Sequence, residues 1–419
     1  MTRLSVLVLV LLSACSGPGA HCPSADAAPP ATTAAFALVT SDYTSSAIAL
    51  LDADGALLTE AYLDSGSASP GLAAALSGDV SLPTEAPGAG RLYWLDRLGV
   101  DLVGEADLAT GALSQYATTP TAVPGEAAFR ANPHDVLALP DGRWLVSRYE
   151  PNYASDASEL DRGNDLVLLD PASHALLGRV GLEALDEDVV GPDGTVPTYA
   201  RPDRMVLRAG RVVVGLARLS VDFKIAAPGA VAVLDADTGE LQTTLLSGLE
   251  GCGEPAPARD DGTRVFVACA GPTYTDLRGR RDGAGVASLH IPTSGPAEVE
   301  WIWRAAEHPE LPPPTEALVP LHDDVVFVVS MGDSTAGERD RLLRLELGDG
   351  TGAIVYESPE AFDLGPGAVS PGGDFLLLPD AVSGVLRFDI VGDTLATPST
   401  IDASPCRRLP ARELRALVL

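Results

Sequence analysis

Positive charge is scarce in this chain of 419 residues. Lys224 is its only lysine, and 28 lysine and arginine residues stand against 58 aspartate and glutamate residues, for a formal net charge of −30. Such a surface repels phosphate backbones and anionic lipid headgroups. Nucleic acid is therefore excluded as a partner, and any attachment to a membrane has to be covalent or hydrophobic.

Several catalytic and cofactor motifs are also missing. The sequence contains no G-x-S-x-G elbow, no G-x-x-x-x-G-K-[ST] loop and no C-x-x-C-H pair. These motifs mark a serine nucleophile, a nucleotide site and a covalent haem. Aromatic residues make up only 5% of the chain. We assign no catalytic residue from the sequence, and it favours a binding protein over an enzyme.

Long apolar runs are missing too, with one short exception at the N-terminus. Arg3 precedes an apolar run over residues 4–12, which is too short for a bilayer span of about 20 residues but has the proportions of a signal peptide. The run ends in "LSAC", where the cysteine is Cys15. This segment resembles the lipobox of bacterial lipoproteins, in which the signal peptide is cleaved before a lipid-carrying cysteine. The alternative is an ordinary signal peptide beside an unrelated cysteine.

The lipoprotein resemblance implies a division of the chain at Cys15. Residues 1–14 form the signal peptide, residues 15–35 a lipidated cysteine with a flexible tether, and residues 36–419 the folded domain. Acyl chains such as palmitate bind a membrane with about 0.8 kcal/mol for each buried CH₂ group. Ser16, in place of Asp, resembles lipoproteins that are sorted to an outer membrane. We therefore expect an exported protein, anchored by its N-terminal lipid to the outer membrane of a bacterial cell envelope, on the periplasmic or the surface side.

An oxidising compartment favours disulfides between the remaining cysteines. Cys252 and Cys269 lie symmetrically about residues 260 and 261, which belong to the turn "ARDDGTR". A tight antiparallel hairpin places them opposite each other and predicts a disulfide. Cys22 and Cys406 are left over, and their pairing would join the tether to the end of the domain.

One phrase recurs along the chain: an apolar strand that ends in an acid, a tight turn and a second apolar strand. Examples are "AIALLDADGALLTEAYL", "DLVLLDPASHALLGRVGL" and "AVAVLDADTGELQTTLL". The seven copies align at Asp52, Asp107, Asp170, Asp235, Ile291, Glu346 and Asp389. Hairpins of a second kind lie between them, with Asp-Gly or Gly-Gly turns as in "PHDVLALPDGRWLVS" and "PGAVSPGGDFLLLP". Such turns between alternating apolar residues are strong hairpin signals.

Two hairpins per repeat make a four-stranded antiparallel sheet that cannot bury both faces alone. Seven such repeats predict an all-β fold, a seven-bladed β-propeller over residues 36–419. The hairpins resemble those of the YVTN-type and lactonase-like propellers of bacteria, which are WD40-like in architecture. Propellers serve as lactonases, quinoproteins, proteases and binding modules, so this resemblance implies a fold and leaves the function open.

The two ends of the domain predict how the ring closes. The first repeat begins at Phe36 without a first strand, and the segment "PARELRALVL" follows the seventh repeat as a single strand. We expect this segment to pair beside residues 36–40 and so to complete one blade. The alternative is a short amphipathic helix.

Loop length is concentrated on one face of the predicted ring, which we call the long-loop face. Turns within the hairpins are short, whereas the connections between second and third strands and between blades include "YEPNYASDASELDRGND" and "GPTYTDLRGRRDGAG". Elaborated loops are common binding sites, and tyrosine and arginine are enriched at binding hot spots. The residues of these types that we predict for the binding face are Arg148, Tyr149, Tyr153, Tyr199 and Tyr274.

The first strand of each blade begins on the same face, at the mouth of the central channel. Equivalent positions there carry His134, Asp203, Glu254 and Glu316. A histidine with three carboxylates could hold a hard divalent cation such as Ca²⁺, or polarise a bound lactone or sugar. The alternative is a water-filled channel lined by solvated polar side chains, and we assign no metal or cofactor.

Two functions follow from this reading. The first is a lipid-anchored propeller of the cell envelope that acts as a binding or scaffold module for a protein, peptide or glycan on its long-loop face. The second is a metal-assisted, lactonase-like hydrolase with its site at the channel mouth. The oligomeric state does not follow from the sequence.

Overall fold

A computed structural model describes residues 31–418, except 67, 68, 70, 73, 98, 121–128, 192, 260, 273–276 and 316 and the side chains of 277–279. Cys15, Cys22 and the predicted signal peptide lie outside the described residues. The tether was predicted to reach residue 35, and this boundary is wrong. Ala34 and Ala35 are fully buried, and the N–H of Ala31 donates to the carbonyl of Leu108 at 2.7 Å. The small apolar side chains of Ala31, Ala34 and Ala35 pack on the domain.

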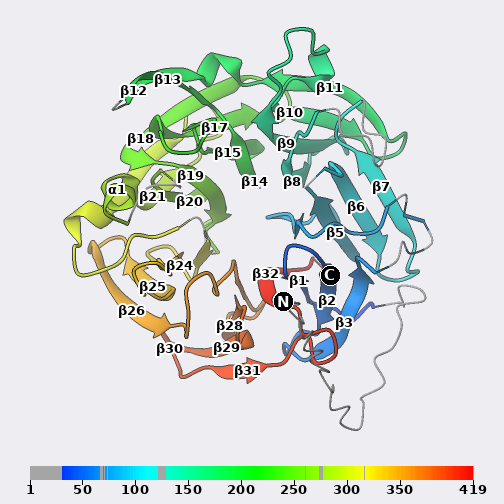
Figure 1. Ribbon diagram of the computed structural model, residues 1–419, viewed down its shortest axis with the longest axis vertical. Helices are drawn as coiled ribbons and strands as arrows, with labels where there is room; N and C mark the ends of the chain where they lie inside the picture. The colour runs from blue at the N-terminus through cyan, green and yellow to red at the C-terminus, as the bar shows by residue number, and fades with distance from the viewer. Residues whose placement is uncertain are drawn as a thin grey trace, which may run out of the picture.

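The described residues form seven antiparallel sheets of four or five strands, arranged around a central axis (Figure 1). From the innermost strand outward, three of the sheets are β32 (Ala411–Ala416), β1 (Phe36–Ser41), β2 (Ser46–Leu51) and β3 (Leu57–Asp64); β4 (Val80–Ser81), β5 (Arg91–Asp96), β6 (Leu102–Asp107) and β7 (Leu113–Ala117); and β8 (Pro133–Ala138), β9 (Trp144–Pro151), β10 (Gly163–Asp170) and β11 (Ala175–Gly181). Three more are β14 (Pro202–Arg208), β15 (Arg211–Leu216), β17 (Pro228–Asp235) and β18 (Leu241–Glu250); β19 (Cys252–Pro257), β20 (Arg264–Ala270), β21 (Ala284–His290) and β22 (Glu298–Arg304); and β23 (Leu318–Pro320), β24 (Val325–Ser330), β25 (Arg341–Glu346) and β26 (Thr351–Glu357). The last contains β27 (Ala368–Val369), β28 (Phe375–Asp380) and β29 (Gly384–Val391), with β30 (Thr394–Leu395) and β31 (Ser399–Ile401) both paired with β29.

This arrangement confirms the predicted all-β propeller fold. An additional sheet of three strands joins β12 (Glu187–Gly191), β13 (Gly194–Tyr199) and β16 (Leu219–Ser220). The helical segments are α1 (Leu277–Gly283) and the 3₁₀ turns η1 (Glu159–Asp161), η2 (Glu183–Leu185) and η3 (Ala305–Glu307). Among the described residues, no helix has the length and apolar character that a membrane crossing requires.

The ring closes as the sequence predicted. Strand β32 pairs antiparallel with β1, with Phe36 opposite Ala416 and Leu38 opposite Leu414. The first and last segments of the domain therefore share one sheet, and the amphipathic helix considered for the C-terminus is wrong. Closure of this kind covers the inner edge of β1 and joins the two ends of the domain in one sheet.

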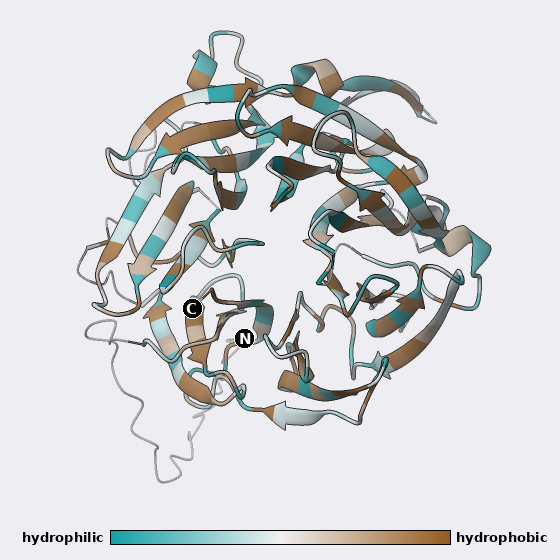
Figure 2. Cartoon of the chain, turned by 180° about the vertical axis from the view of Figure 1, so that it is seen from behind, coloured by the Kyte–Doolittle hydropathy of each residue, from teal (hydrophilic) through white to brown (hydrophobic). Residues whose placement is uncertain are grey.

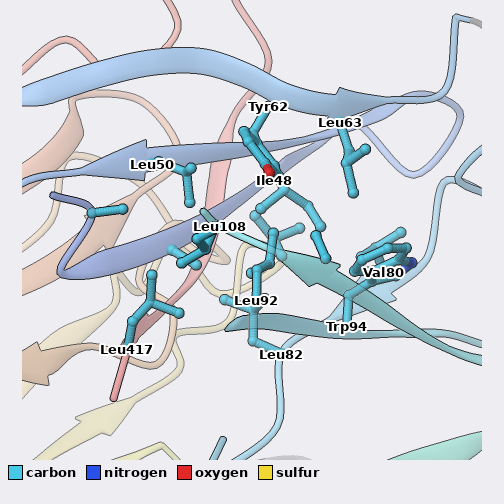
Figure 3. Packing of buried hydrophobic residues seen from close by; sticks show 14 of the residues in the cluster. Ile48, Leu50, Tyr62, Leu63, Val80, Leu82, Leu92, Trp94, Leu108 and Leu417 are labelled. Carbon is cyan, nitrogen blue, oxygen red and sulfur yellow. The ribbon is translucent and has the colours of Figure 1, made fainter. Parts of the chain in front are cut away.

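The core lies between neighbouring sheets, because each sheet buries apolar side chains on both faces. Figure 2 shows apolar residues along the strands, and Figure 3 shows one inter-sheet cluster, in which Ile48 and Leu50 of β2 pack with Leu92 and Trp94 of β5. Trp94 lies opposite Gly104 in the sheet, and a Cβ at residue 104 would stand 1.9 Å from the indole Cε2. Glycine at this position makes room for the buried ring.

The repeated acid has a structural role in the turn that follows it. One carboxylate oxygen of Asp235 accepts the N–H groups of Asp237 at 3.1 Å and Thr238 at 2.8 Å. Asp52 closes its turn through the N–H groups of Asp54 and Ala56. Aspartate is favoured at such positions because its short side chain caps the backbone of its own turn. The recurring acid thus stabilises the turn of a hairpin and does not mark a ligand site.

The cysteines in the described part of the chain are oxidised. Cys252 of β19 and Cys269 of β20 are directly opposite and form a disulfide, with their Cα atoms 3.9 Å apart, which confirms the predicted pair. Cys406 is also disulfide-bonded. Its predicted partner, Cys22, lies outside the described residues.

Candidate binding face and central channel

Most of the long connections between strands lie on one face, as predicted, but residues 82–90 between β4 and β5 form a long connection on the opposite face. The other connections of the opposite face are shorter, and only residues 209–210 separate β14 from β15. On the long-loop face, residues 182–201 connect β11 to β14 and carry β12 and β13, while residues 271–283 connect β20 to β21 and carry α1. The additional sheet at the rim of the ring (Figure 1) is therefore built from loops of this face.

Arg204 of β14 links the inner strands of three sheets. Its guanidinium donates to the carbonyl of Leu82 at 2.5 Å, to the hydroxyl of Ser81 at 2.7 Å and to the carboxylate of Glu413 at 3.0 Å. Ser81 in turn donates to Glu413 at 2.8 Å. Burial alone would lower the pKa of Arg204, but the negative charge of Glu413 beside it holds that pKa above its usual value.

Arg415 of β32 makes a second link across the inner strands. It donates to both carboxylate oxygens of Glu254 on β19, one of them at 2.9 Å, and to Glu413 at 3.1 Å. Burial alone would raise the pKa of Glu413, and the charges of Arg204 and Arg415 lower it instead. Two guanidinium groups and two carboxylates thus compensate one another in a buried network, which we call the channel network (Arg204, Glu254, Glu413, Arg415).

The four residues predicted to converge as a ligand set are not all brought together. His134 meets Asp203, with Nδ1 of the ring 2.5 Å from the carboxylate, while Glu254 is engaged by Arg415. Glu316 lies outside the described residues. Among the residues that are described, no group of three or more His, Cys, Asp or Glu side chains is arranged to hold a metal ion.

The pair of His134 and Asp203 is mostly buried, with 14% of the histidine side chain exposed. Burial lowers the pKa of His134, and the nearby carboxylate of Asp203 only partly opposes this. Burial would raise the pKa of Asp203, but His134 and Arg204 hold it below its usual value. A neutral imidazole donates from Nδ1 to an ionised Asp203, and its other nitrogen is then an acceptor.

An arginine–aromatic stack continues from His134 toward the long-loop face. The ring of Tyr149 stacks on His134 at a centroid distance of 4.2 Å. The guanidinium of Arg201 lies 5.0 Å from the ring centroid of Tyr149 and 4.4 Å from that of Phe223. Arg201 is fully buried and ion-paired with Glu150 at 2.7 Å. This stack fixes the loops around the channel mouth.

Only part of the predicted binding face is available to a partner. Arg148 is fully buried and paired with Asp165 through two hydrogen bonds of 2.8 and 2.7 Å, so its prediction as a surface contact is wrong. Tyr149 is nearly buried. Tyr153 is 57% exposed and packs edge-on against Tyr199 at 5.5 Å. Tyr274 lies outside the described residues.

The sequence reading missed two aromatic residues on this face. Tyr43, between β1 and β2, and Phe362, between β26 and β27, are 66% and 53% exposed. Both have left-handed backbones, with φ of 65° and 63°, which is unfavourable for bulky side chains. Arg412 joins them: its guanidinium lies 4.9 Å from the ring centroid of Tyr43 and donates to the carbonyl of Phe362 at 3.0 Å. The left-handed backbone of these two residues has no signal in the sequence. Their proximity has none either, because the two loops are more than three hundred residues apart in the chain.

Comparisons with solved structures agree with the fold. The chain is similar to the β-propeller domain of Cps50 (Swd1) from Myceliophteria thermophila, with a TM-score of 0.51 and 13% identity over 85% of this chain and 98% of that one. It is also similar to a catalytically inactive virginiamycin B lyase from Staphylococcus aureus in complex with quinupristin, with a TM-score of 0.50 and 10% identity over 86% of this chain and 96% of that one. No protein-family model and no curated protein matches the sequence. At such low identity the likeness shows a propeller fold and no function.

Proposed function

We propose that this protein is a lipid-anchored propeller of the bacterial cell envelope that binds a protein, peptide or glycan on its long-loop face. The observation that carries the proposal is the exposed aromatic pair, Tyr43 and Phe362, held in left-handed backbone around Arg412. Strained backbone persists where the surrounding structure enforces it, and such positions cluster at binding sites. Exposed rings of this kind supply contact area with little loss of side-chain freedom.

The channel network supports binding on the face rather than inside the channel. Its buried arginines and carboxylates already satisfy one another. A ligand that displaced them would leave charges unpaired in a buried site, which is strongly unfavourable. Binding to Tyr43 and Phe362 carries no such penalty, because their rings are exposed to solvent.

The anchor part of the proposal rests on Cys15 and its lipobox-like context. Cys15→Ser removes the only thiol that the signal peptidase pathway would acylate. We expect it to abolish metabolic labelling with an alkyne-tagged palmitate and to release the protein from the membrane fraction. Labelling that persists in the Cys15→Ser variant would contradict the lipid anchor at Cys15, but it would not bear on the proposed binding to the long-loop face.

The binding part is tested by a double variant of the aromatic pair, Tyr43→Ser with Phe362→Ser. Affinity purification of the full chain from envelope extracts, followed by mass spectrometry, should lose the partner in this variant. The matched control is Leu177→Ser with Val299→Ser, because these apolar residues are also exposed but lie on the outermost strands β11 and β22. Equal partner recovery with both double variants would contradict the proposal.

A second candidate function, hydrolysis at the channel mouth, is favoured by one observation. Asp203 accepts from Nδ1 of His134 at 2.5 Å, which orients the ring as in a general base. The described residues give His134 no other hydrogen-bond partner. Turnover of a panel of γ- and δ-lactones, with and without added Ca²⁺, tests this candidate with His134→Asn as the inactive control. The absence of turnover above that control would remove it.

A further inference from the structure

The seam where the ring closes contains a cavity of about 500 Å³ on the long-loop face. It lies between the loop Ala381–Gly384, which connects β28 to β29, and the segment 402–411, which leads into β32. Thr40, at the end of β1, contributes to the same wall. The volume falls in the range of small-molecule and peptide side-chain sites.

Arg408 lines this cavity. It is exposed, and the described residues offer its guanidinium neither a hydrogen bond nor an ion pair. Its neighbour Arg407, by contrast, is ion-paired with Asp64 at 2.7 Å. Other described arginines, such as Arg259 and Arg412, also lack an acidic partner, but they donate to backbone carbonyls. Arg408 instead presents its charge at the cavity, where it can pair with an anionic ligand.

The backbone around Arg408 is held in place. Arg408 has a left-handed backbone with φ of 56°. Its N–H donates to the carbonyl of Ser404 at 2.9 Å, and the N–H of Leu409 donates to the hydroxyl of Ser404 at 3.1 Å. Cys406, two residues earlier, is disulfide-bonded and donates its N–H to Glu60 at 2.8 Å. The loop is therefore preorganised, which reduces the entropy lost when a ligand binds.

The lining selects one kind of anion. A planar guanidinium matches the oxygens of a carboxylate or a phosphate, and a carboxylate carries only one negative charge. Asp402 lies in the same cavity and repels further negative charge, so a polymer of acidic sugars with repeated charges is disfavoured. Val382, Pro405 and Leu409 add an apolar wall, which suits an apolar side chain next to the carboxylate.

We propose that this cavity captures the free C-terminal carboxylate of a peptide or protein whose last residue is apolar, with Arg408 as the carboxylate-binding group. This inference rests on the proposed binding function and specifies its ligand class. The site adjoins the aromatic pair, because Thr40 precedes Tyr43 by three residues and Ala411, which also lines the cavity, precedes Arg412.

The test uses an array of fluorescent tetrapeptides that differ in the last residue, each made as the free acid and as the amide. Affinity for the full chain is measured by fluorescence polarisation with wild type, Arg408→Ala, Arg408→Lys and the control Arg143→Ala. Arg143 is a matched control because it is partly exposed, on the short turn between β8 and β9 of the opposite face. We expect acids with an apolar last residue to bind, and both amidation and Arg408→Ala to weaken binding at least tenfold. Arg408→Lys should be intermediate, and Arg143→Ala should match wild type.

The losses of affinity caused by amidation and by Arg408→Ala should not be additive, because both changes remove the same ion pair. The proposal is overturned if no peptide binds, if acids and amides bind equally, if Arg408→Ala binds like wild type, or if glucuronate competes better than the peptides. Should it fail while the Tyr43 and Phe362 double variant still loses its partner, the proposed function stands with another ligand. Should both experiments fail, both proposals fall.

Discussion

Strand β32 contributes to two regions of the molecule, the buried channel network and the exposed long-loop face, and its arginines have different roles in them. Along β32, Glu413 and Arg415 are two residues apart, so they share one face of the strand and enter the channel network, where every charge has a partner. Arg412 lies on the other side and reaches Tyr43 and the loop of Phe362. The register between β1 and β32 shifts at Arg412, which has no residue opposite it, and a bulge of this kind redirects a side chain. One strand thus carries residues that hold the ring together and a residue that shapes its surface. The comparison shows that the role of an arginine here follows from its partner and its burial.

The largest expected effect comes from breaking the channel network. Arg415→Met leaves Glu254 without its ion-pair partner in a buried site, and we expect a loss of about 3–5 kcal/mol in the free energy of unfolding. Urea denaturation measures it. Arg143→Ala, on an exposed turn, should change the same quantity by less than about 0.5 kcal/mol.

The double variant Arg415→Met with Glu254→Gln separates charge from packing. It removes both charges of the pair, so it should recover most of the loss seen with Arg415→Met alone. A single variant that costs less than about 1 kcal/mol would show that the network does not stabilise the closed ring.

The next largest effect concerns the inner edge of the β19 sheet. The Cys252–Cys269 disulfide closes a loop with a sequence separation of 17 residues. Replacing both cysteines by alanine should cost about 2–4 kcal/mol, chiefly because the unfolded chain gains freedom. Peptide binding by the intact fraction should stay unchanged, because neither cysteine lines the cavity of Arg408. An unchanged unfolding midpoint would contradict the expectation.

A smaller effect is expected from pH, through carboxylic acids buried beside the channel. Burial raises the pKa of Asp135 to about 7 and that of Asp96 to about 6. A raised pKa means that the folded state favours the protonated form, so the associated stability is present at low pH and is lost as the pH rises through these values. Turn aspartates such as Asp235, whose pKa is lowered by the N–H groups of its turn, act in the opposite direction at lower pH.

The free energy of unfolding should therefore peak at about pH 4, fall by on the order of 1–3 kcal/mol up to about pH 7, and change little above that. Asp135→Asn should flatten the fall above pH 5, because the side chain no longer titrates. Stability that rises steadily from pH 5 to pH 8 would contradict this assignment. Denaturation series at fixed ionic strength provide the measurement.

The smallest effect on stability is expected on the long-loop face. Phe362→Gly removes an exposed ring from a left-handed backbone, so the free energy of unfolding should change by less than about 1 kcal/mol, in the stabilising direction. Partner recovery from envelope extracts should nevertheless fall sharply. Val299→Gly, in an outermost strand, should do the reverse: lower stability slightly and leave partner recovery intact. Loss of both stability and binding in Phe362→Gly would contradict the separation of roles between the channel network, which stabilises the fold, and the long-loop face, which binds the partner.

The fold could be predicted from the sequence because it depends on local patterns. Turn aspartates such as Asp52 and Asp235, alternating apolar residues and the symmetric cysteines Cys252 and Cys269 each act within a single hairpin. The closing strand could be predicted as well, because the first repeat lacks a strand that the C-terminal segment supplies.

The site could be predicted only in part, because its contacts join distant sheets. The acidic residue Glu254 was identified at the channel mouth, but its partner Arg415 is 161 residues away, and "ARELRA" has no feature that directs it to the axis. Arg148 was assigned to the surface because the sequence does not show that Asp165 is its ion-pair partner. The left-handed backbones of Tyr43 and Phe362 arise from tertiary contacts, which no local propensity reports.

Photo-cross-linking in living cells tests the central claim most directly. A photoreactive amino acid is placed at Tyr43 or Phe362 on the long-loop face, and at Asp141 or Gly372 in short turns of the opposite face. All four positions are exposed, so labelling chemistry is comparable. The account predicts discrete adducts from positions 43 and 362 and none from 141 and 372. Adducts from the short-turn positions, with none from the long-loop face, would contradict it.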